Sequence, residues 1–278
     1  MRWKALIRSH SGVLGAVIVV LFLATAALAP VVAPTDPTAQ NLRAALRPPG
    51  QDGYLLGSDE LGRDTLSRII YGSRISLAIG LASVGFGLVL GVPLGLMAGY
   101  QGRALDSVTM RAADIVIALP RLLIGIVIVA TWGIGFWTLV MAIGVPDIPV
   151  FARLVRGSTL QVAQMEYVTA ARALGSPDSR IMFRHIFPNL VGPLTVQVTF
   201  SMAAAILTAG GLSFLGLGVR PPTPEWGYML AQARVYMRVA PHLITYPGVA
   251  LAVVVLGINL LGDALRQAYD PRFRGKEA

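Results

Sequence analysis

Five long stretches of this sequence contain no Asp, Glu, Lys or Arg, and each is long enough to cross a lipid bilayer as a helix. They cover residues 9–35, 75–102, 122–146, 185–219 and 242–262. A helix needs roughly 20 predominantly apolar residues to span the hydrocarbon core. Only 13% of the 278 residues are charged, whereas soluble globular proteins have about 25%. The chain has too few charges to cover a water-exposed body, and we expect most of it to lie in lipid.

A sixth span is predicted around the third stretch, because apolar residues already start at Val108. We predict one span over Ser107–Trp132, a break at Gly133, and a shorter span over Phe136–Leu154. The fold class is therefore all-α, a polytopic membrane protein with about six transmembrane helices. The first span imitates a secretory signal, but its apolar core over 12–29 is longer than the 7–15 residues of such signals, so we expect it to be retained.

The distribution of Lys and Arg predicts that both termini are cytoplasmic, because the segments that this topology places inside carry most of the basic residues. We expect two parts: 1–74, an N-terminal transmembrane helix with an extracytoplasmic segment, and 75–278, a five-helix core with a cytoplasmic loop over 153–190. The net charge is +9, but the basic residues form no run interleaved with aromatic residues. We therefore expect no nucleic-acid partner.

The loop between the predicted fourth and fifth spans is longer than a plain connection, which needs only a few residues. Gln161–Leu174 is helix-forming, and Gly175 follows at the position of a left-handed cap. Ser176 is predicted to cap a second helix over Pro177–Phe187, which Pro188 would end. We expect a rigid elbow of helix, glycine hinge and helix that projects into water and docks against a partner protein.

Several motifs resemble those of bacterial ABC-importer permeases. Thr169-Ala170-Ala171, followed by Gly175 and Pro188, resembles the EAA loop that contacts the ATPase subunit in such importers. Further stretches are similar to the second permease subunit of dipeptide, oligopeptide and nickel importers. They are LGSDELGRDTLSR from Leu56, LSFLGLG from Leu212, and GDALR from Gly262 with Asp270-Pro271-Arg272.

The resemblance implies a type I ABC importer permease fold and the import of di- or oligopeptides across the cytoplasmic (inner) membrane. It implies a sister permease as heterodimer partner, two ATPase subunits, an extracytoplasmic solute-binding protein and the surrounding lipid bilayer.

The resemblance also assigns the ATPase-coupling contact to the elbow, at Ala170, Ala171, Gly175 and Pro188. The chain departs from the motif at Thr169, where the family usually has an acid. Glu166 lies three residues earlier on the same helix face and is expected to substitute in part. A second departure is Ala209, where the family often has a glutamate.

Arg121 lies near the middle of the predicted third span. An ionised side chain there costs at least about 2.5–3.5 kcal/mol, so it must face protein or water. Two interpretations stay open: Arg121 borders the translocation path and attracts a carboxylate such as a peptide C-terminus, or it pairs with an acid on a neighbouring helix. Asp114, the other candidate path residue, is most simply an i,i+3 partner of Arg111.

The predicted second span carries a stripe of small residues at four-residue spacing, and for this stripe we favour packing within the chain over a subunit interface or a pore wall. The stripe consists of Ser83, Gly87, Gly91, Gly95 and Gly99.

On the extracytoplasmic side, Arg63, Asp64 and Arg220 are candidate contacts for the solute-binding protein, with an ordinary solvated surface as the alternative.

The motifs of several other functions are missing. The sequence has no cysteine, no ATP-binding P-loop and no H-E-x-x-H, and its three histidines are far apart. We expect no metal site, no cofactor and no catalytic residues, so the chain is not itself an enzyme. The alternatives are the same machinery importing nickel or another small chelate, and an ion-coupled secondary transporter, which would have inverted repeats that the sequence lacks.

Overall fold

The computed structural model describes residues 9–269, and its regular structure is almost entirely helical. The basic residues Arg2, Lys4 and Arg8, which we used to orient the chain, and the Asp270-Pro271-Arg272 motif lie outside the described residues. The helices are α2 His10–Ala27, α3 Ala29–Val32, η1 Leu42–Ala44, α4 Thr65–Gln101, α5 Arg103–Ala118, α6 Arg121–Trp132, α7 Phe136–Gly144, η2 Val145–Asp147, α8 Ile148–Ala163, α9 Glu166–Ala173, α10 Asp178–Arg180, η3 Ile181–Ile186, α11 Phe187–Phe214, α12 Trp226–Ala233, η4 Arg234–Tyr236 and α13 His242–Tyr269.

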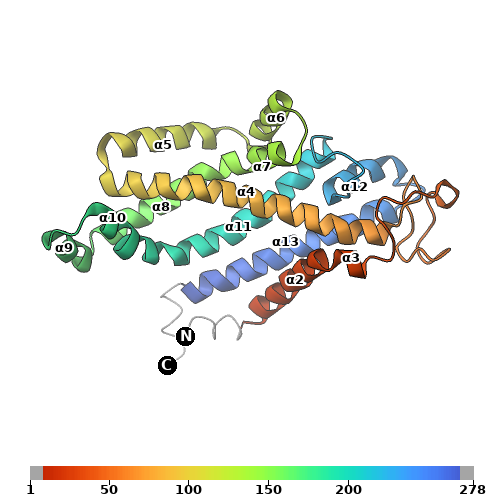
Figure 1. The fold of residues 1–278 in the computed structure, drawn as a ribbon, viewed down its shortest axis with the longest axis horizontal. Helices are drawn as coiled ribbons and strands as arrows, with labels where there is room; N and C mark the ends of the chain where they lie inside the picture. The colour runs from red at the N-terminus through yellow and green to blue at the C-terminus, as the bar shows by residue number, and fades with distance from the viewer. Residues whose placement is uncertain (1–8, 270–278) are drawn as a thin grey trace.

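Five helices in the described part of the chain are long and apolar enough to cross a membrane, and the bent pair α5–α6 is a sixth candidate. This confirms the prediction of about six spans. Figure 1 shows α4, α11 and α13 running lengthwise through the molecule, with α9 and α10 at one end and α3 and α12 at the other. We call these the elbow end and the opposite end. Helix α4 has 37 residues, about 55 Å at 1.5 Å per residue, so it is longer than a bilayer core of about 30 Å. It also runs without a break across the predicted boundary between 1–74 and 75–278.

The third predicted span is not one helix. Helices α5 and α6 meet at an angle of 91°, and the break falls at Leu119 and Pro120. Leu119 is extended, with φ −90° and ψ 138°, because a proline ring disfavours the helical conformation in the residue before it. Arg121 therefore lies at the first position of α6, directly after the break, rather than inside a continuous helix.

The fourth predicted span is longer than expected, because the helix continues from Phe136 to Ala163. The prolines near its middle do not end it. Pro146 falls at the start of a 3₁₀ turn over Val145–Asp147, and Pro149 falls in the first turn of α8. Both prolines are tolerated because the 3₁₀ turn interrupts the α-helical hydrogen bonds, and the first N–H groups of the segment after such an interruption have no partner inside it.

The stripe of small residues on α4 packs within the chain, which confirms the favoured interpretation. A Cβ atom added to Gly91 would lie 2.5 Å from the carbonyl oxygen of Ile148, and one added to Gly99 would lie 2.8 Å from that of Arg156. Helix α8 can approach the backbone of α4 this closely only because the stripe lacks side chains. The stripe on α4 is therefore the face against which α8 packs.

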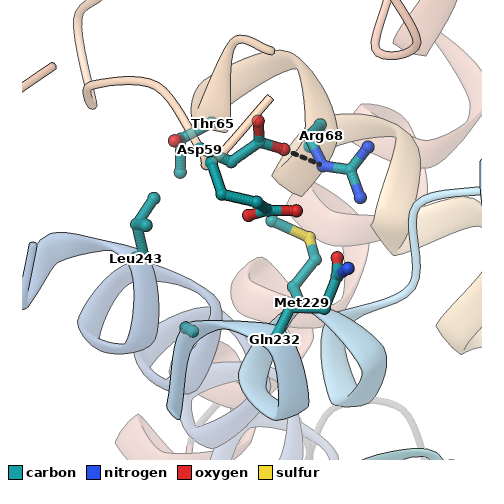
Figure 2. A pocket seen from close by; sticks show the side chains of 8 residues that line it. Asp59, Thr65, Arg68, Met229, Gln232 and Leu243 are labelled. Atoms are coloured by element: carbon teal, nitrogen blue, oxygen red, sulfur yellow. Dashed lines mark ion pairs between the residues drawn. The ribbon is translucent and has the colours of Figure 1, made fainter. Parts of the chain in front are cut away.

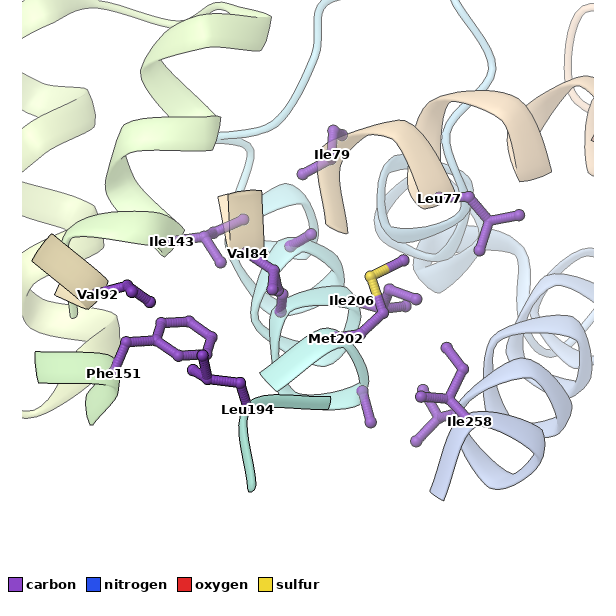
Figure 3. Close-up of a cluster of buried hydrophobic side chains, with 14 of the residues drawn as sticks. Leu77, Ile79, Val84, Val92, Ile143, Phe151, Leu194, Met202, Ile206 and Ile258 are labelled. Carbon is purple, nitrogen blue, oxygen red and sulfur yellow. The ribbon is translucent and has the colours of Figure 1, made fainter. Parts of the chain in front are cut away.

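The apolar core lies between α4, α8, α11 and α13. Figure 3 shows its side chains, among them Ile79 of α4, Phe151 of α8, Ile206 of α11 and Ile258 of α13. The N-terminal helix α2 packs on α13, where a Cβ on Gly15 would lie 2.8 Å from the carbonyl oxygen of Gly257. All the long helices thus share one bundle.

Candidate functional site

A short helix, α9, forms the tip of the elbow and ends in a glycine turn. Gly175 has a φ of +75°, and the N–H groups of Gly175 and Ser176 donate to the carbonyl groups of Arg172 and Ala171. This is a Schellman motif, in which glycine adopts the positive φ without a steric penalty. The predicted left-handed cap at Gly175 is confirmed.

The boundaries of the first elbow helix differ from the prediction of Gln161–Leu174. Helix α8 continues to Ala163, and a turn precedes α9, which begins only at Glu166. Met165 is extended, with φ −71° and ψ 143°. The elbow therefore covers residues 164–187, and its first two residues form the turn between α8 and α9.

The second half of the elbow runs directly into α11. Pro177 is the N-cap, without a side-chain hydrogen bond, so the predicted cap at Ser176 is wrong by one position. Pro188 does not end the helix as predicted, because the helix continues from Asp178 to Phe214. The turn before Pro188 widens into a π-helix, in which the N–H of Phe187 donates to the carbonyl of Met182, five residues back. In this wider turn the carbonyl four residues before Pro188 is displaced from the proline ring, with which it would otherwise clash. The helix therefore continues past Pro188.

The elbow is held by buried apolar side chains and presents others to the outside. Val168 and Ala171 of α9 are buried, and so are Ile181 and Ile186 of the π-helix that α9 packs against. Leu174 is 86% exposed and Phe183 is 65% exposed. Of the predicted coupling residues, Ala171 is buried and points into the elbow. Glu166, Thr169, Ala170, Gly175 and Pro188 are exposed.

The end of α4 supports the elbow, which the sequence did not suggest. The hydroxyl of Tyr100 donates to Asp178 Oδ1 at 2.6 Å, and the guanidinium of Arg172 lies 5.5 Å from the centre of the Tyr100 ring. Within the elbow region, Asn189 Nδ2 donates to the hydroxyl of Tyr167 at 3.1 Å. Tyr100 is more than 70 residues from Asp178 in sequence, and no local signal links the two.

Ion pairs join α5 and α6 to the helix that leads into the elbow. Arg121 pairs with Asp147 of η2. Asp114 pairs with Arg153 of α8, so the predicted local pair of Arg111 with Asp114 is wrong. The carboxylate is drawn instead to a cation on the helix packed beside α5.

A second contact between α5 and α8 lies nearer the elbow end. Arg156 donates to both oxygens of Asp106, with its Nε 2.9 Å from Oδ1. Such bidentate pairs fix the orientation of both side chains. Helix α5 is therefore tied to α8 at Asp106 and at Asp114.

At the opposite end, two of the three candidate docking residues are buried. Arg63 is 2% exposed and Asp64 is 5% exposed. The Nε of Arg63 donates to Asp59 Oδ2 at 2.6 Å, and Asp64 caps α4 by accepting from the N–H of Ser67 at 2.7 Å. Both charged groups are bound by partners within the chain, so the structure does not support the expectation that these side chains contact the solute-binding protein directly. Arg220 is exposed.

The same ion-pair cluster borders a small pocket between the start of α4 and α12. Figure 2 shows Asp59, Thr65 and Arg68 on one side of it and Met229 and Gln232 on the other. Arg68 is 1% exposed, and its Nε lies 3.3 Å from Asp59 Oδ2. The cluster holds segment 36–64 against the start of α4.

Helix α12 is fixed to α4 by a buried glutamate and a buried tryptophan. Glu225 is 1% exposed and caps α12 by accepting from the N–H groups of Gly227 and Tyr228 at 2.9 and 2.8 Å. Trp226 is fully buried, and its Nε1 donates to the carbonyl of Ile69 at 3.0 Å. Trp226 with Gly227 belongs to the stretch after LSFLGLG that resembles the permease family, but sequence reasoning missed Glu225, because a lone acid in a loop carries no distinctive spacing.

Among the described residues, no three His, Asp or Glu side chains gather as metal ligands would. The expectation that the chain holds no metal or cofactor stays a prediction.

Comparisons with known proteins cover nearly the whole chain. The family model described as "Binding-protein-dependent transport system inner membrane component" matches residues 91–275. The model described as "N-terminal TM domain of oligopeptide transport permease C" matches residues 1–49. The chain is 44% identical over 277 residues to the di/tripeptide transport system permease protein of Pseudomonas aeruginosa (strain UCBPP-PA14), covering 98% of this chain and 91% of that protein.

A second relative and a solved structure extend the comparison. The glutathione transport system permease protein of Pectobacterium atrosepticum is 43% identical over 272 residues, covering 98% of this chain and 90% of that protein. An inward-facing structure of the MetNI methionine ABC transporter has a TM-score of 0.59 at 20% identity, covering 73% of this chain and 96% of that chain. The last similarity concerns the fold alone.

Proposed function

This chain belongs to the family of inner membrane components of binding-protein-dependent transport systems, and we propose that it is the permease subunit through which an ATP-driven importer moves small peptides. Its proposed partners are a sister permease, two ATPase subunits and an extracytoplasmic solute-binding protein. ATP hydrolysis takes place on the separate ATPase subunits. Relatives named for di/tripeptide and glutathione transport support a peptide as the solute.

The elbow is the observation that carries this proposal. It leaves the side chains of Leu174 and Phe183 exposed, while Val168 and Ala171 hold α9 against the π-helix. We propose that these exposed side chains enter a groove on the ATPase and that the elbow end is cytoplasmic. Both termini are then cytoplasmic too, because the start of α2 and the end of α13 point toward that end (Figure 1).

The elbow is connected to the bundle in a way that suits a lever. It follows α8 after a short turn, and its second half continues as one helix into α11. Tyr100 joins it to the end of α4. A displacement of α9 is therefore passed to α8, α11 and α4 together. ATP binding drives the change because the ATPase subunits bind ATP with different affinity in the two states of the transporter.

The translocation path is proposed to pass the break between α5 and α6, and we propose that the non-helical backbone of this break lies at membrane depth. Such backbone is tolerated in a membrane only where protein covers it or where it lines a water-filled cavity. Arg121 is 39% exposed at this break, and a cation at a helix start attracts a carboxylate. The proposed role of Asp114 is to border the same path. Of the docking candidates, Arg220 remains proposed for the solute-binding protein.

The test of the elbow uses two exposed side chains and a matched control at the other end. We expect L174D together with F183D to abolish co-purification of the ATPase while the chain still inserts in the membrane. L55D is the control, because Leu55 is 65% exposed and lies in the segment at the opposite end. If the double variant still retains its ATPase, the proposed contact is wrong. Loss of labelled dipeptide uptake in the double variant but not in L55D completes the test.

A further inference from the structure

Helix α5 presents two different stripes to the outside. Ala113 is the one buried residue of this helix among those that the structure describes. Residues 107, 111, 114 and 118 are exposed and lie on one face, since they follow each other at intervals of four, three and four. They are Ser107, Arg111, Asp114 and Ala118. We call this the polar stripe.

The neighbouring stripe of α5 is apolar and equally exposed. Val108 is 66% exposed and Ile115 is 68% exposed. Both lie about 100° further round the helix than Ser107 and Asp114, respectively. We call this the apolar stripe. The two stripes thus occupy the same depth in the bundle and differ in direction and in chemistry.

The charges of the polar stripe cannot face lipid tails. Asp114 and its partner Arg153 on α8 are 68% and 48% exposed. Arg111 is exposed, and it forms no ion pair with any residue between 9 and 269. A charged side chain in the hydrocarbon costs at least about 2.5–3.5 kcal/mol, so charged residues in spans face protein or water. The apolar stripe carries no such cost.

We propose that the polar stripe of α5 lines the water-filled translocation path at the elbow end, and that the apolar stripe is turned away from water. This rests on the proposed function, since it assigns a surface to the path of that permease. Arg111, Asp114 and Arg153 form the charged wall, with one more positive than negative charge. Such a wall holds the carboxylate of a peptide more favourably than a neutral one. The stripe ends at Ala118, directly before the break at Leu119 and Pro120, and Arg121 lies directly after that break.

The absence of cysteine from the sequence makes the direct test simple. Single cysteines are placed at Ser107 and Ala118 on the polar stripe and at Val108 and Ile115 on the apolar stripe. Inside-out vesicles from the host, containing the complete transporter, are treated with a charged, membrane-impermeant thiol reagent. A thiol must ionise in water to react, so we expect S107C and A118C to be labelled at least about tenfold faster than V108C and I115C.

Two results would overturn the inference. Equal rates for the two stripes, or faster labelling of the apolar stripe, would mean that the polar stripe does not line water. Protection of S107C and A118C in the complete transporter, with labelling once the chain is expressed alone, would mean that the sister permease covers this face.

Failure of the proposed function is measured separately. Uptake of labelled dipeptide is assayed for the cysteine-free parent and for each unlabelled variant. A parent that transports peptide but lacks the labelling contrast overturns only the path assignment. A parent that transports no peptide while its membranes retain a functional ATPase complex overturns peptide import itself.

Discussion

Arg121 and Asp147 form an ion pair whose two members differ sharply in exposure. The Nη2 of Arg121 lies 2.9 Å from Oδ1 of Asp147, and the side chains are 39% and 0% exposed. Arg121 opens α6 after the proline break, and Asp147 closes the 3₁₀ turn before α8. The pair therefore joins the two places where the α-helical backbone is interrupted, the break before α6 and the 3₁₀ turn before α8. Its acid lies on a neighbouring element, as the packing interpretation of Arg121 requires.

Removing the cation should destabilise the protein more than neutralising the acid. R121A leaves the buried carboxylate of Asp147 without its partner, which destabilises the folded protein. Since solvent screens the partly exposed arginine, we expect the loss of unfolding free energy to be at most about 3 kcal/mol. D147N leaves a partly exposed arginine that water can reach, so its effect should be smaller. The apparent melting temperature of the purified transporter measures both. If R121A melts no lower than D147N, the pair does not stabilise the bundle.

The double variant R121A/D147N separates the two interpretations of Arg121. We expect it to recover most of the stability lost in R121A, since no buried charge remains. If Arg121 also binds the solute, the double variant will have a raised KM for dipeptide uptake despite its stability. An unchanged KM would leave Arg121 with a packing role alone.

The close approach of α4 and α8 predicts that a single methyl group disrupts it. In G91A the new Cβ would lie 2.5 Å from the carbonyl oxygen of Ile148, so the two helices must separate. We expect a loss of about 1–3 kcal/mol, the usual cost of overpacking. G85A is the matched control on the same helix, because a Cβ there meets nothing within 4 Å. Equal melting temperatures for the two variants would contradict this packing.

The glycine hinge of the elbow should tolerate asparagine better than a β-branched residue. Gly175 has a φ of +75°, and a Cβ added there would meet nothing within 4 Å, so strain in the backbone decides the outcome. G175N should retain the turn, because asparagine adopts this conformation more readily, whereas G175V should lose about 1–2 kcal/mol at the turn. Stimulation of ATPase activity by the solute is the readout. If G175V stimulates as well as G175N, the hinge does not transmit the signal.

Glu225 should make the stability of the opposite end depend on pH. Burial raises the pKa of Glu225 above its ordinary value of 4.5, against the lowering effect of the N–H groups that it accepts from. A raised pKa in the folded state means that the folded protein binds the proton more tightly, so stability is greatest at low pH and falls as the pH rises through the folded pKa.

The variant E225Q provides the control for this pH dependence. Glutamine cannot ionise, so the decline of melting temperature with rising pH should be weaker in E225Q than in the parent. Parallel curves for the two proteins would show that Glu225 does not titrate in this range.

The sequence by itself determined the features that depend on local composition. Charge-free runs predicted the membrane class and about six spans, because the length of an apolar helix is set by bilayer thickness. The position of Gly175 after a helix-forming stretch predicted the left-handed turn, since few residues other than glycine adopt a positive φ. The small stripe on α4 predicted a close helix contact within the chain, and the resemblance of its motifs identified the family.

The tertiary structure decided which distant groups meet. Asp114 pairs with Arg153 rather than with Arg111, and Arg63 is buried against Asp59, because packing rather than sequence distance brings these charges together. Proline ended a helix at Pro120 but not at Pro188, where a π-helix absorbs the lost hydrogen bond. The link from Tyr100 to the elbow joins residues far apart in the chain. Such contacts depend on how helices pack, and local sequence does not encode them.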